Sequence, residues 1–286
     1  MKVLVTGGAG FIGSHLCKRL LSEGHEVHSL DNYSTGNTSN HLSVEGFIAI
    51  YTKGDVSKWD DIKKLPNDFD VVFHLAGLLD VNNSLSDPNL YMQTNVVGVT
   101  NMLEFCRINN IKKFIYAGSC ASTKPLSSPY ALTKYIPEYF LELYNNLFDI
   151  NTLSVRFYNV YGENMTTSGF KLVVSIFLEA FRNNLPLPIV GDGKQTRDYI
   201  YVGDIVNGLI KCLEYKGNRK IFNLGTGKSV SINEIVSMFG NVKTINIPER
   251  NEPKHIEPSD VLISKSELGW EAKTSMKSWI KNSIKK

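Results

Sequence analysis

The chain begins with Lys2-Val-Leu-Val-Thr6, followed by Gly7-Gly-Ala-Gly-Phe-Ile-Gly-Ser-His15. The first run predicts a buried parallel strand, and the residues that follow the glycines predict a helix. In such a turn the glycines permit a tight bend, a close approach of the backbone to a pyrophosphate, and close helix–strand packing. Free N–H groups at the helix start favour an anion. The strand–turn–helix context therefore predicts dinucleotide binding rather than an ordinary glycine-rich loop. The candidate contacts in this turn are Gly7, Gly10, Phe11, Ile12 and Gly13.

The first half of the chain alternates apolar runs with segments of helical periodicity. The expected strands are Glu26–Leu30, Phe47–Tyr51, Asp70–Leu75, Lys113–Ala117 and Thr152–Phe157, and the expected helices are Ser14–Ser22, Leu90–Ile108 and Ala131–Leu147. This alternation predicts an α/β fold with a doubly wound parallel sheet of the Rossmann type. Beyond Gly162 the pattern loosens, but Tyr201–Tyr215 and Ile221–Leu224 are expected to return to the first sheet. We therefore expect a smaller α/β substrate domain interleaved with the first in sequence.

Bulk composition excludes several classes of protein. The 286 residues carry a net charge of +3, which implies no strong attraction to nucleic acid. The first expected strand begins at Lys2 and leaves no room for a signal peptide, and no apolar run is long enough to span a bilayer. The four cysteines are scattered, as in proteins of a reducing cytoplasm, and the six histidines form no metal-binding pattern.

Acidic and small residues at later strand ends extend the expected cofactor site. Asp31 follows the glycine turn by about twenty residues, where a carboxylate accepts hydrogen bonds from the adenosine ribose and repels a 2′-phosphate. The sequence thus favours NAD over NADP. Small residues after the fourth strand suit a backbone that passes close to the cofactor, although they also suit plain packing. The further candidate contacts are Asn32, Ser34, Thr35, Gly36, Asp55, Val56, Leu75, Ala76 and Gly77.

Tyr130-Ala-Leu-Thr-Lys134 is the second decisive stretch. On a helix, residues i and i+4 lie on one face, so the phenol and the ammonium address one site. A free tyrosine has a pKa of about 10, and the positive charges of a lysine and an oxidised nicotinamide would lower it. Ser119 ends the fifth strand, at the edge where doubly wound sheets bind ligands, and its hydroxyl is placed to hold a reacting oxygen.

Together these residues resemble the extended short-chain dehydrogenase/reductases, specifically the NAD-dependent nucleotide-sugar epimerase/dehydratase group. The resemblance covers nearly the whole chain. It rests on Thr6–His15, Asp31–Gly36, His74–Gly77, Val81-x-x-Ser84-x-x-Asp87-Pro88, Asn95–Gly98, Tyr130–Lys134, Arg156–Asn159, Gly191–Asp198, Val202-x-Asp204, Phe222–Gly225 and Leu268–Trp270. It implies an NAD-binding domain of residues 1–162 plus 199–226 and a nucleotide-sugar-binding domain of residues 163–198 plus 227–286.

The resemblance also implies roles for individual residues. The catalytic set is Ser119, Tyr130 and Lys134, of which the last two also contact the cofactor, together with Asn95 and Phe157. Substrate contacts fall on Val81, Ser119, Tyr130, Asn159, Leu172, Arg197 and Arg250. Guanidinium groups suit the diphosphate of a nucleotide sugar because they are planar and permanently charged.

The implied activity is epimerisation at C4 of a UDP-hexose through a 4-keto intermediate, with NAD recycled as a bound cofactor. A nucleotide 4-keto-6-deoxysugar reductase or a 4,6-dehydratase is the alternative, and a non-catalytic dinucleotide sensor is disfavoured because Tyr130 and Lys134 are both present. Ser119 is followed by Cys120-Ala-Ser-Thr123 without a carboxylate, which argues against dehydration. The stretch from Ser119 to Tyr130 is short for this family, so the identity of the sugar stays undecided. Pro137 is expected to kink the helix that carries Tyr130 and Lys134. The family implies a homodimer through Leu90–Ile108 and Ala131–Leu147.

Overall fold

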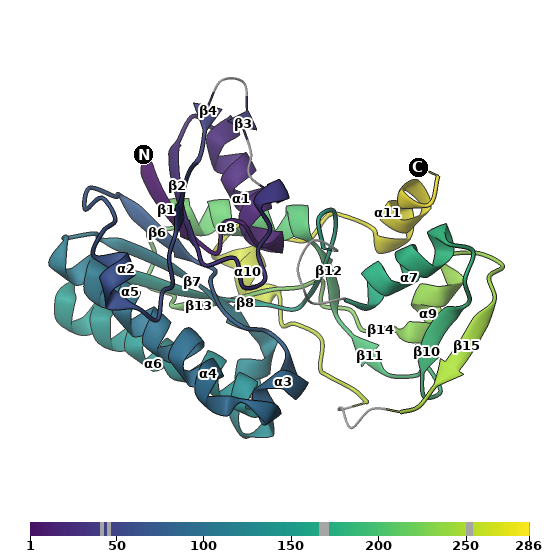
Figure 1. Cartoon of the computed structure of the whole chain (residues 1–286). Coiled ribbons are helices and arrows are strands. Elements are labelled where there is room, and N and C mark those ends of the chain that lie inside the picture. Colours follow the sequence, from purple (N-terminus) through teal and green to yellow (C-terminus); the bar gives the residue numbers. More distant parts are fainter. Residues whose placement is uncertain (41–42, 45–46, 166–171, 250–253, 286) are drawn as a thin grey trace.

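The computed structural model describes residues 1–40, 43–44, 47–165, 172–249 and 254–285. A seven-stranded sheet dominates the larger half of the molecule, in the order β13-β8-β7-β6-β1-β2-β5 (Figure 1). All six neighbouring pairs run parallel. The strands are β1 (Lys2–Thr6), β2 (Glu26–Asp31), β5 (Ile50–Lys53), β6 (Val71–His74), β7 (Lys113–Ser119), β8 (Asn151–Phe157) and β13 (Ile221–Leu224). The expected doubly wound Rossmann sheet is confirmed.

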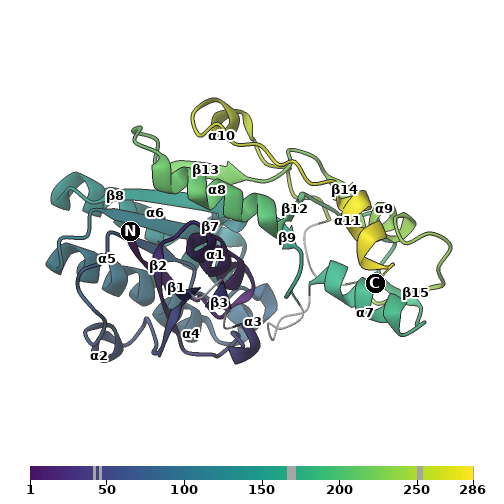
Figure 2. The same cartoon turned by 90° about the horizontal axis from the view of Figure 1, so that it is seen from above.

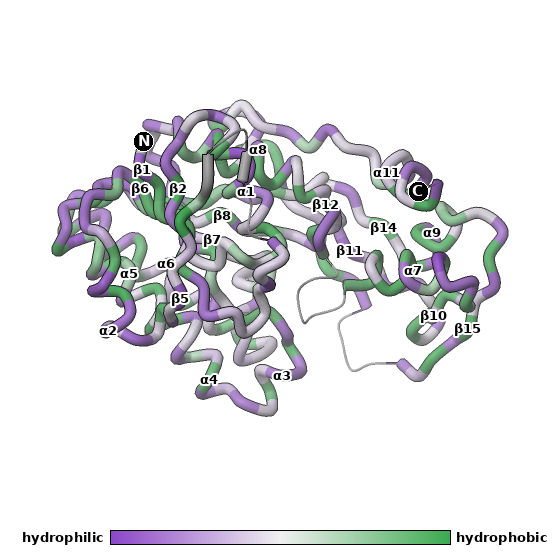
Figure 3. The backbone as a smooth tube through the Cα atoms, turned by 45° about the horizontal axis from the view of Figure 1, so that its top comes forward, coloured by the Kyte–Doolittle hydropathy of each residue, from purple (hydrophilic) through white to green (hydrophobic). Residues whose placement is uncertain are grey.

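Helices cover both faces of this sheet (Figure 2). One apolar core joins the sheet to α1 (Phe11–Ser22) and α8 (Val202–Glu214). The other core joins it to α2 (Trp59–Ile62), α5 (Gly98–Ile108) and α6 (Pro129–Phe148). Val3 and Val5 enter the first core and Leu4 the second, because successive side chains of a strand point to opposite faces. Apolar residues therefore predominate along the central strands (Figure 3).

The predicted helix Leu90–Ile108 is a chain of shorter elements. It comprises the end of α4 (Pro88–Met92), a π-helical turn η2 (Gln93–Val97) and α5, after a separate helix α3 (Val81–Ser86). Pro88 begins α4 and Asp87 caps it by accepting from the Leu90 N–H. The prediction of one continuous α-helix is wrong at η2, and such turns often occur at functional sites.

The predicted strand Phe47–Tyr51 is also displaced. The structure pairs β4 (Phe47–Ile48) with β3 (Ser43–Val44) in a small antiparallel sheet, and the strand that joins the main sheet is β5. By contrast, α6 continues through Pro137 to Phe148. Short 3₁₀ turns complete this half: η1 (Thr38–Asn40), η3 (Cys120–Thr123) and η4 (Pro125–Ser127).

The second group of elements lies to one side of the main sheet (Figure 1). It packs around its own apolar core, which contains Tyr161, Phe177, Ile235 and Ile280. Its elements are β9 (Asn159–Tyr161), α7 (Val173–Arg182), β10 (Leu187–Val190), β11 (Thr196–Arg197), β12 (Tyr199–Tyr201), β14 (Val230–Ser231), α9 (Ile232–Ser237), β15 (Thr244–Ile247) and α11 (Met276–Ser283). They form three two-stranded sheets: β9 with β12, β10 with β15, and β11 with β14.

The chain returns to the larger half before its last helix. Helix α10 (Leu262–Ser266) follows β15 of the second group, yet Leu268 and Trp270 lie in the same core as β1 and α8. The predicted division assigns this stretch to the smaller domain, whereas its side chains pack against the larger one. In the described part of the chain, no helix combines the length and the apolar character needed to cross a bilayer.

Candidate active site

The glycine turn between β1 and α1 has no room for side chains. Gly7 adopts a φ of +73°, and a Cβ there would lie 2.8 Å from the Ala76 nitrogen. A Cβ on Gly13 would overlap the Gly7 carbonyl, to which the Gly10 N–H also donates at 3.1 Å. Phe11 and Ile12 form the first turn of α1. The backbone here is therefore accessible as a cradle for an anion at the start of the helix.

Asp31 fastens the turn to the end of β2. Its carboxylate is buried and accepts the Ala9 N–H at 3.0 Å and the Tyr33 N–H at 2.8 Å. Gly36 closes over the same carboxylate, since a Cβ there would lie 2.9 Å from Oδ1. The loop that carries Asn32, Ser34 and Thr35 thus folds back onto the glycine turn.

The loops after β2 and β5 are joined by side chains. Asn32 donates to the Asp55 carboxylate at 3.1 Å. Although burial acts to raise it, hydrogen bonds from Ser57 and Asn32 hold the pKa of Asp55 below its ordinary value. Val56 packs against Gly98 at the start of α5. Asp55 and Val56, both predicted cofactor contacts, therefore lie at the carboxyl end of the sheet, beside the loop that follows β2.

The loop after β6 is held by residues from β1 and η2. Thr6 Oγ1 lies 3.0 Å from the His74 ring and accepts the Ala76 N–H at 3.2 Å. Burial, with a contribution from the charge of Lys134, lowers the pKa of His74 to about 3, so its ring is neutral. Asn95 accepts from Leu78 N at 2.8 Å and donates to Leu78 O at 3.1 Å. This loop, with Leu75 and Gly77, is thereby fixed against the sheet edge.

The three predicted catalytic residues meet at the end of β7. Ser119 Oγ accepts the Ala121 N–H at 3.2 Å. Burial raises the pKa of the Tyr130 phenol, and the Ser119 side chain beside it acts in the opposite direction. Lys134 lies one turn further along α6, where burial lowers its pKa to about 8. Its Nζ donates to the Ala117 carbonyl at 3.0 Å, and a Cβ on Gly77 would lie 3.1 Å from it.

Several residues hold α6 in place, and of these Ser84, Ser128 and Thr133 lie outside the predicted set. Ser84 accepts the Tyr130 N–H at 3.1 Å, and Ser128 caps the helix by accepting the Ala131 N–H. Asn95 donates to Thr133 Oγ1 at 3.1 Å, which links η2 to the catalytic turn. Ser84 lies in the quoted Val81–Pro88 stretch, but its contact with α6 spans 46 residues and has no local signal.

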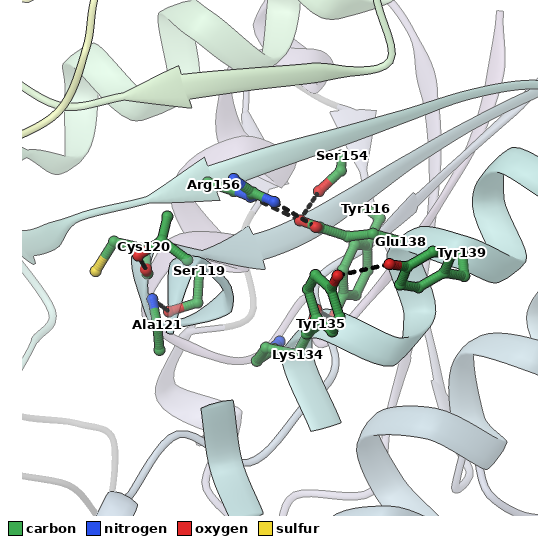
Figure 4. Close-up of polar contacts among 11 residues, drawn as sticks. Tyr116, Ser119, Cys120, Ala121, Lys134, Tyr135, Glu138, Tyr139, Ser154 and Arg156 are labelled. Atoms are coloured by element: carbon green, nitrogen blue, oxygen red, sulfur yellow. Dashed lines mark hydrogen bonds and ion pairs between the residues drawn. The ribbon is translucent and has the colours of Figure 1, made fainter. Parts of the chain in front are cut away.

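A buried ion pair ties the next turn of α6 to β8 (Figure 4). The Glu138 carboxylate accepts from Arg156 through Nε at 2.9 Å and through Nη2, and from Ser154 Oγ at 2.9 Å. Glu138 lies one helical turn beyond Lys134, so the Glu138–Arg156 pair anchors the catalytic segment of α6 to β8. Tyr135 and Tyr139 bond to each other through their hydroxyls, apart from this pair.

The predicted substrate residues come from the second group of elements. Asn159 begins β9, and Arg197 ends β11 and donates to the Thr196 and Lys254 carbonyls. Burial raises the pKa of the Cys120 thiol, and the charge of Arg197 opposes this, which puts Arg197 in the neighbourhood of the segment after Ser119.

The remaining predicted residues are less closely connected to this site. Val81 begins α3 with its side chain exposed, although its carbonyl accepts from Ser84. Leu172 precedes α7 at the edge of the smaller core, and Phe157 ends β8 in the larger core. Arg250 lies outside the described residues. The described residues contain no group of three side chains able to hold a metal ion.

The residues present fit an adenine dinucleotide. A turn without side-chain room, a helix start and the Asp31 carboxylate would receive the pyrophosphate and the ribose. Lys134 and Tyr130 lie beyond the same sheet edge with Ser119, where a nicotinamide and a hydroxyl-bearing substrate would meet. The arrangement suits reversible oxidation of an alcohol.

Comparison with known proteins places the chain among sugar-nucleotide enzymes. Residues 3–225 match the model of the NAD dependent epimerase/dehydratase family. The chain is 33% identical over 306 residues to a UDP-glucose 4-epimerase of Mycolicibacterium smegmatis, covering 99% of this chain and 97% of that protein. The UDP-glucose 4-epimerase of Thermotoga maritima, solved with UDP-glucose, has a TM-score of 0.92 at 30% identity and covers 100% and 98% of the two chains.

A third relative is named for a sugar acid in place of a neutral sugar. The UDP-glucuronic acid 4-epimerase of Bacillus cereus, solved with UDP-glucuronic acid and NAD, has a TM-score of 0.86 at 28% identity and covers 100% of this chain and 99% of that one. The family match over most of the chain agrees with the glycine turn, Asp31 and the Tyr130–Lys134 helix face. The chain belongs to the NAD-dependent epimerase/dehydratase family.

Proposed function

We propose that this protein catalyses NAD-dependent epimerisation at C4 of a UDP-hexose. The observation that carries the proposal is the buried meeting of Tyr130, Lys134 and Ser119 at the carboxyl end of the sheet. The named relatives act on UDP-glucose and UDP-glucuronic acid, which differ at C6, and the reaction at C4 is what they share.

The chain's own residues divide the work. Tyr130 takes the proton of the sugar 4-hydroxyl and later returns it, while Ser119 hydrogen-bonds the C4 oxygen. Bound NAD⁺ supplies a reversible hydride acceptor for C4 and a positive charge that favours the Tyr130 phenolate. Lys134 is held between Ala117 and Gly77, where its ammonium would bind the nicotinamide ribose. Arg197 and Asn159 hold the diphosphate while the 4-keto sugar rotates, so that its opposite face turns toward the nicotinamide and takes the hydride back.

The test uses purified protein and no added reductant. We expect interconversion of UDP-galactose with UDP-glucose, of the N-acetyl pair or of the uronate pair, followed by NMR. Tyr130→Phe removes the proton carrier, and we expect kcat to fall by a factor on the order of 10² to 10⁴. Tyr135→Phe on the same helix is the matched control, because its hydroxyl bonds to Tyr139 outside the site. Failure to epimerise any of these pairs would refute the proposal.

A reductase of a nucleotide 4-keto-6-deoxysugar uses the same three residues and is the second candidate. It would consume reduced cofactor in stoichiometric amounts, normally NADPH, and the buried Asp31 carboxylate disfavours a 2′-phosphate. Mass spectrometry of small molecules released from denatured protein separates the two, since a recycled cofactor is retained as NAD.

We also propose that the protein is a homodimer formed through α4, α5 and α6. Leu90 on α4 is 49% exposed, and Leu143 and Leu147 on α6 are 45% and 65% exposed. Apolar side chains of this size on neighbouring helices suit a two-fold contact with a second copy. Sedimentation analysis should give a dimer, and Leu147→Glu together with Leu143→Glu should give a monomer.

A further inference from the structure

Asp198 lies between β11 and β12 and is 1% exposed. Its Oδ1 accepts from Thr226 N at 2.9 Å and from Thr226 Oγ1 at 2.6 Å. Its Oδ2 accepts from Gly227 N at 3.0 Å, Ser259 N at 3.0 Å and Ser259 Oγ at 2.6 Å. One buried carboxylate thus receives hydrogen bonds from two segments that lie 28 to 61 residues further along the chain.

The backbone carbonyl of Asp198 binds a further segment, at the start of β9. Its carbonyl accepts from Asn159 N at 2.9 Å and from Asn159 Nδ2 at 3.2 Å. Gly225 packs directly on the carboxylate, since a Cβ there would lie 2.6 Å from Oδ2. The residue before Asp198 is Arg197, whose guanidinium donates to the Lys254 carbonyl at 3.2 Å. Three other stretches of chain, at Asn159, residues 225–227 and Ser259, therefore meet at this one residue.

This meeting point adjoins the catalytic segment. The charges of Asp198 and Arg197 both act on Cys120, the residue after Ser119, and that of Asp198 acts on Tyr158, the residue before Asn159. Since such effects fall off with distance, the cluster lies near the segment that follows Ser119 and near Asn159, both of which the proposed function assigns to the sugar nucleotide.

We propose that Asp198 is a positioning residue for the nucleotide-sugar half of the site. By tying Thr226–Gly227 and Ser259 to the β11–β12 junction, it fixes Arg197 and Asn159 at the spacing that a diphosphate requires. This inference rests on the proposed function. Asp198 itself contacts no reacting atom, and its role is to set the positions of Arg197 and Asn159, which bind the substrate. It leaves the cofactor half, built on β1, β2 and β6, unaffected.

An amide cannot replace this carboxylate. In Asp198→Asn one end of the side chain becomes an NH₂ group, which must face either the two Thr226 donors or the Gly227 and Ser259 donors. Donors facing donors repel and leave buried N–H groups unpaired, so the three segments separate. Contacts made equally to substrate and transition state are then lost, which raises KM with little change in kcat.

The experiment measures UDP binding by calorimetry with the NAD-loaded protein, alongside kcat and KM for the best UDP-hexose. For Asp198→Asn we expect Kd for UDP and KM to rise roughly tenfold, kcat to stay within about threefold, and bound NAD to be retained. Thr226→Val removes a single donor to the same carboxylate and should shift Kd in the same direction by about threefold. It keeps the proposal testable if Asp198→Asn does not fold.

Asp204→Asn is the matched control. Asp204, in α8, is also a buried carboxylate that accepts backbone N–H groups, but its partners are Lys273 at 3.2 Å and Thr274 at 2.9 Å, in the stretch between α10 and α11. It should lower stability and leave the Kd for UDP unchanged.

Two results would overturn the proposal. One is a Kd for UDP within about twofold of wild type in the folded Asp198 and Thr226 variants, and the other is an equal loss of UDP affinity in Asp204→Asn. Wild-type protein that binds UDP but epimerises no UDP-hexose refutes the proposed function and leaves the binding result to decide this inference. Wild-type protein that binds no UDP overturns both.

Discussion

The ion pair between Glu138 and Arg156 gives the sharpest stability prediction. Glu138→Ala removes a carboxylate that is 6% exposed and accepts three hydrogen bonds, two of them from a guanidinium that is 16% exposed. The variant leaves the Arg156 charge half-buried without its counter-ion. The cost of the substitution is therefore chiefly that of the stranded charge, and not the net contribution of the pair.

Breaking a buried ion pair in this way costs about 3–5 kcal/mol, and the partial exposure of Arg156 points to the lower end, about 3 kcal/mol. The matched control is Glu104→Ala on α5. Glu104 also pairs with an arginine, Arg107, but their side chains are 35% and 41% exposed. Water screens such a pair, so we expect its loss to cost about 1 kcal/mol or less.

Urea unfolding at pH 7, followed by circular dichroism, compares the two variants with wild type. Glu138→Leu combined with Arg156→Met should recover most of the loss, because both charges are then absent and the packing volume is kept. If Glu138→Ala costs no more than Glu104→Ala, the pair does not hold α6 against β8 and the reasoning is refuted.

Three further predictions concern the cofactor side. Gly13→Ala places a methyl group against the Gly7 carbonyl, so NAD affinity should fall by more than about tenfold in a fluorescence titration, and unchanged affinity would contradict the cradle. Asp31→Ala frees the Ala9 N–H and should weaken NAD binding far more than NADP binding, which competition titration measures. Because the folded-state pKa of Lys134 is lowered to about 8 from 10.5, the unfolded state holds the extra proton between these values. Stability should therefore rise with pH across that window relative to Lys134→Met, and kcat should decline above pH 8 as the ammonium is lost.

The sheet was predictable from sequence because its signals are local. Val3, Leu4 and Val5 fill cores on both faces, and the glycine turn follows them directly, so a short stretch specifies strand, turn and helix. The prediction of a strand at Phe47–Tyr51 was wrong because no local signal decides it. The apolar pattern is similar in β4 and β5, and the partner that decides between them, β2, lies elsewhere in the chain.

The supports of the site were not predictable, since their partners are distant. Glu138 meets Arg156 across 18 residues, and Asp198 meets Ser259 across 61, with no periodicity to relate them. The π-helical turn η2 also leaves no signal in the spacing of the apolar residues. A family motif places Asn95 and Asp198 among residues of interest, but only the fold shows their protein partners, Thr133 for Asn95 and Ser259 for Asp198.

Pro137 explains why the catalytic turn depends on these distant supports. It lacks the N–H that would bond to the Thr133 carbonyl, so the helix loses an internal bond directly after the segment that carries Tyr130 and Lys134. Tertiary contacts reach the same turn: the Tyr116 hydroxyl donates to the Lys134 carbonyl at 3.4 Å, and Asn95 donates to Thr133 Oγ1. Contacts with β7 and η2 thus hold the helix where its own ladder is weakened. Because η2 also carries the bonds to the Leu78 backbone, the same asparagine positions the loop after β6 and the turn of α6 that carries Tyr130 and Lys134.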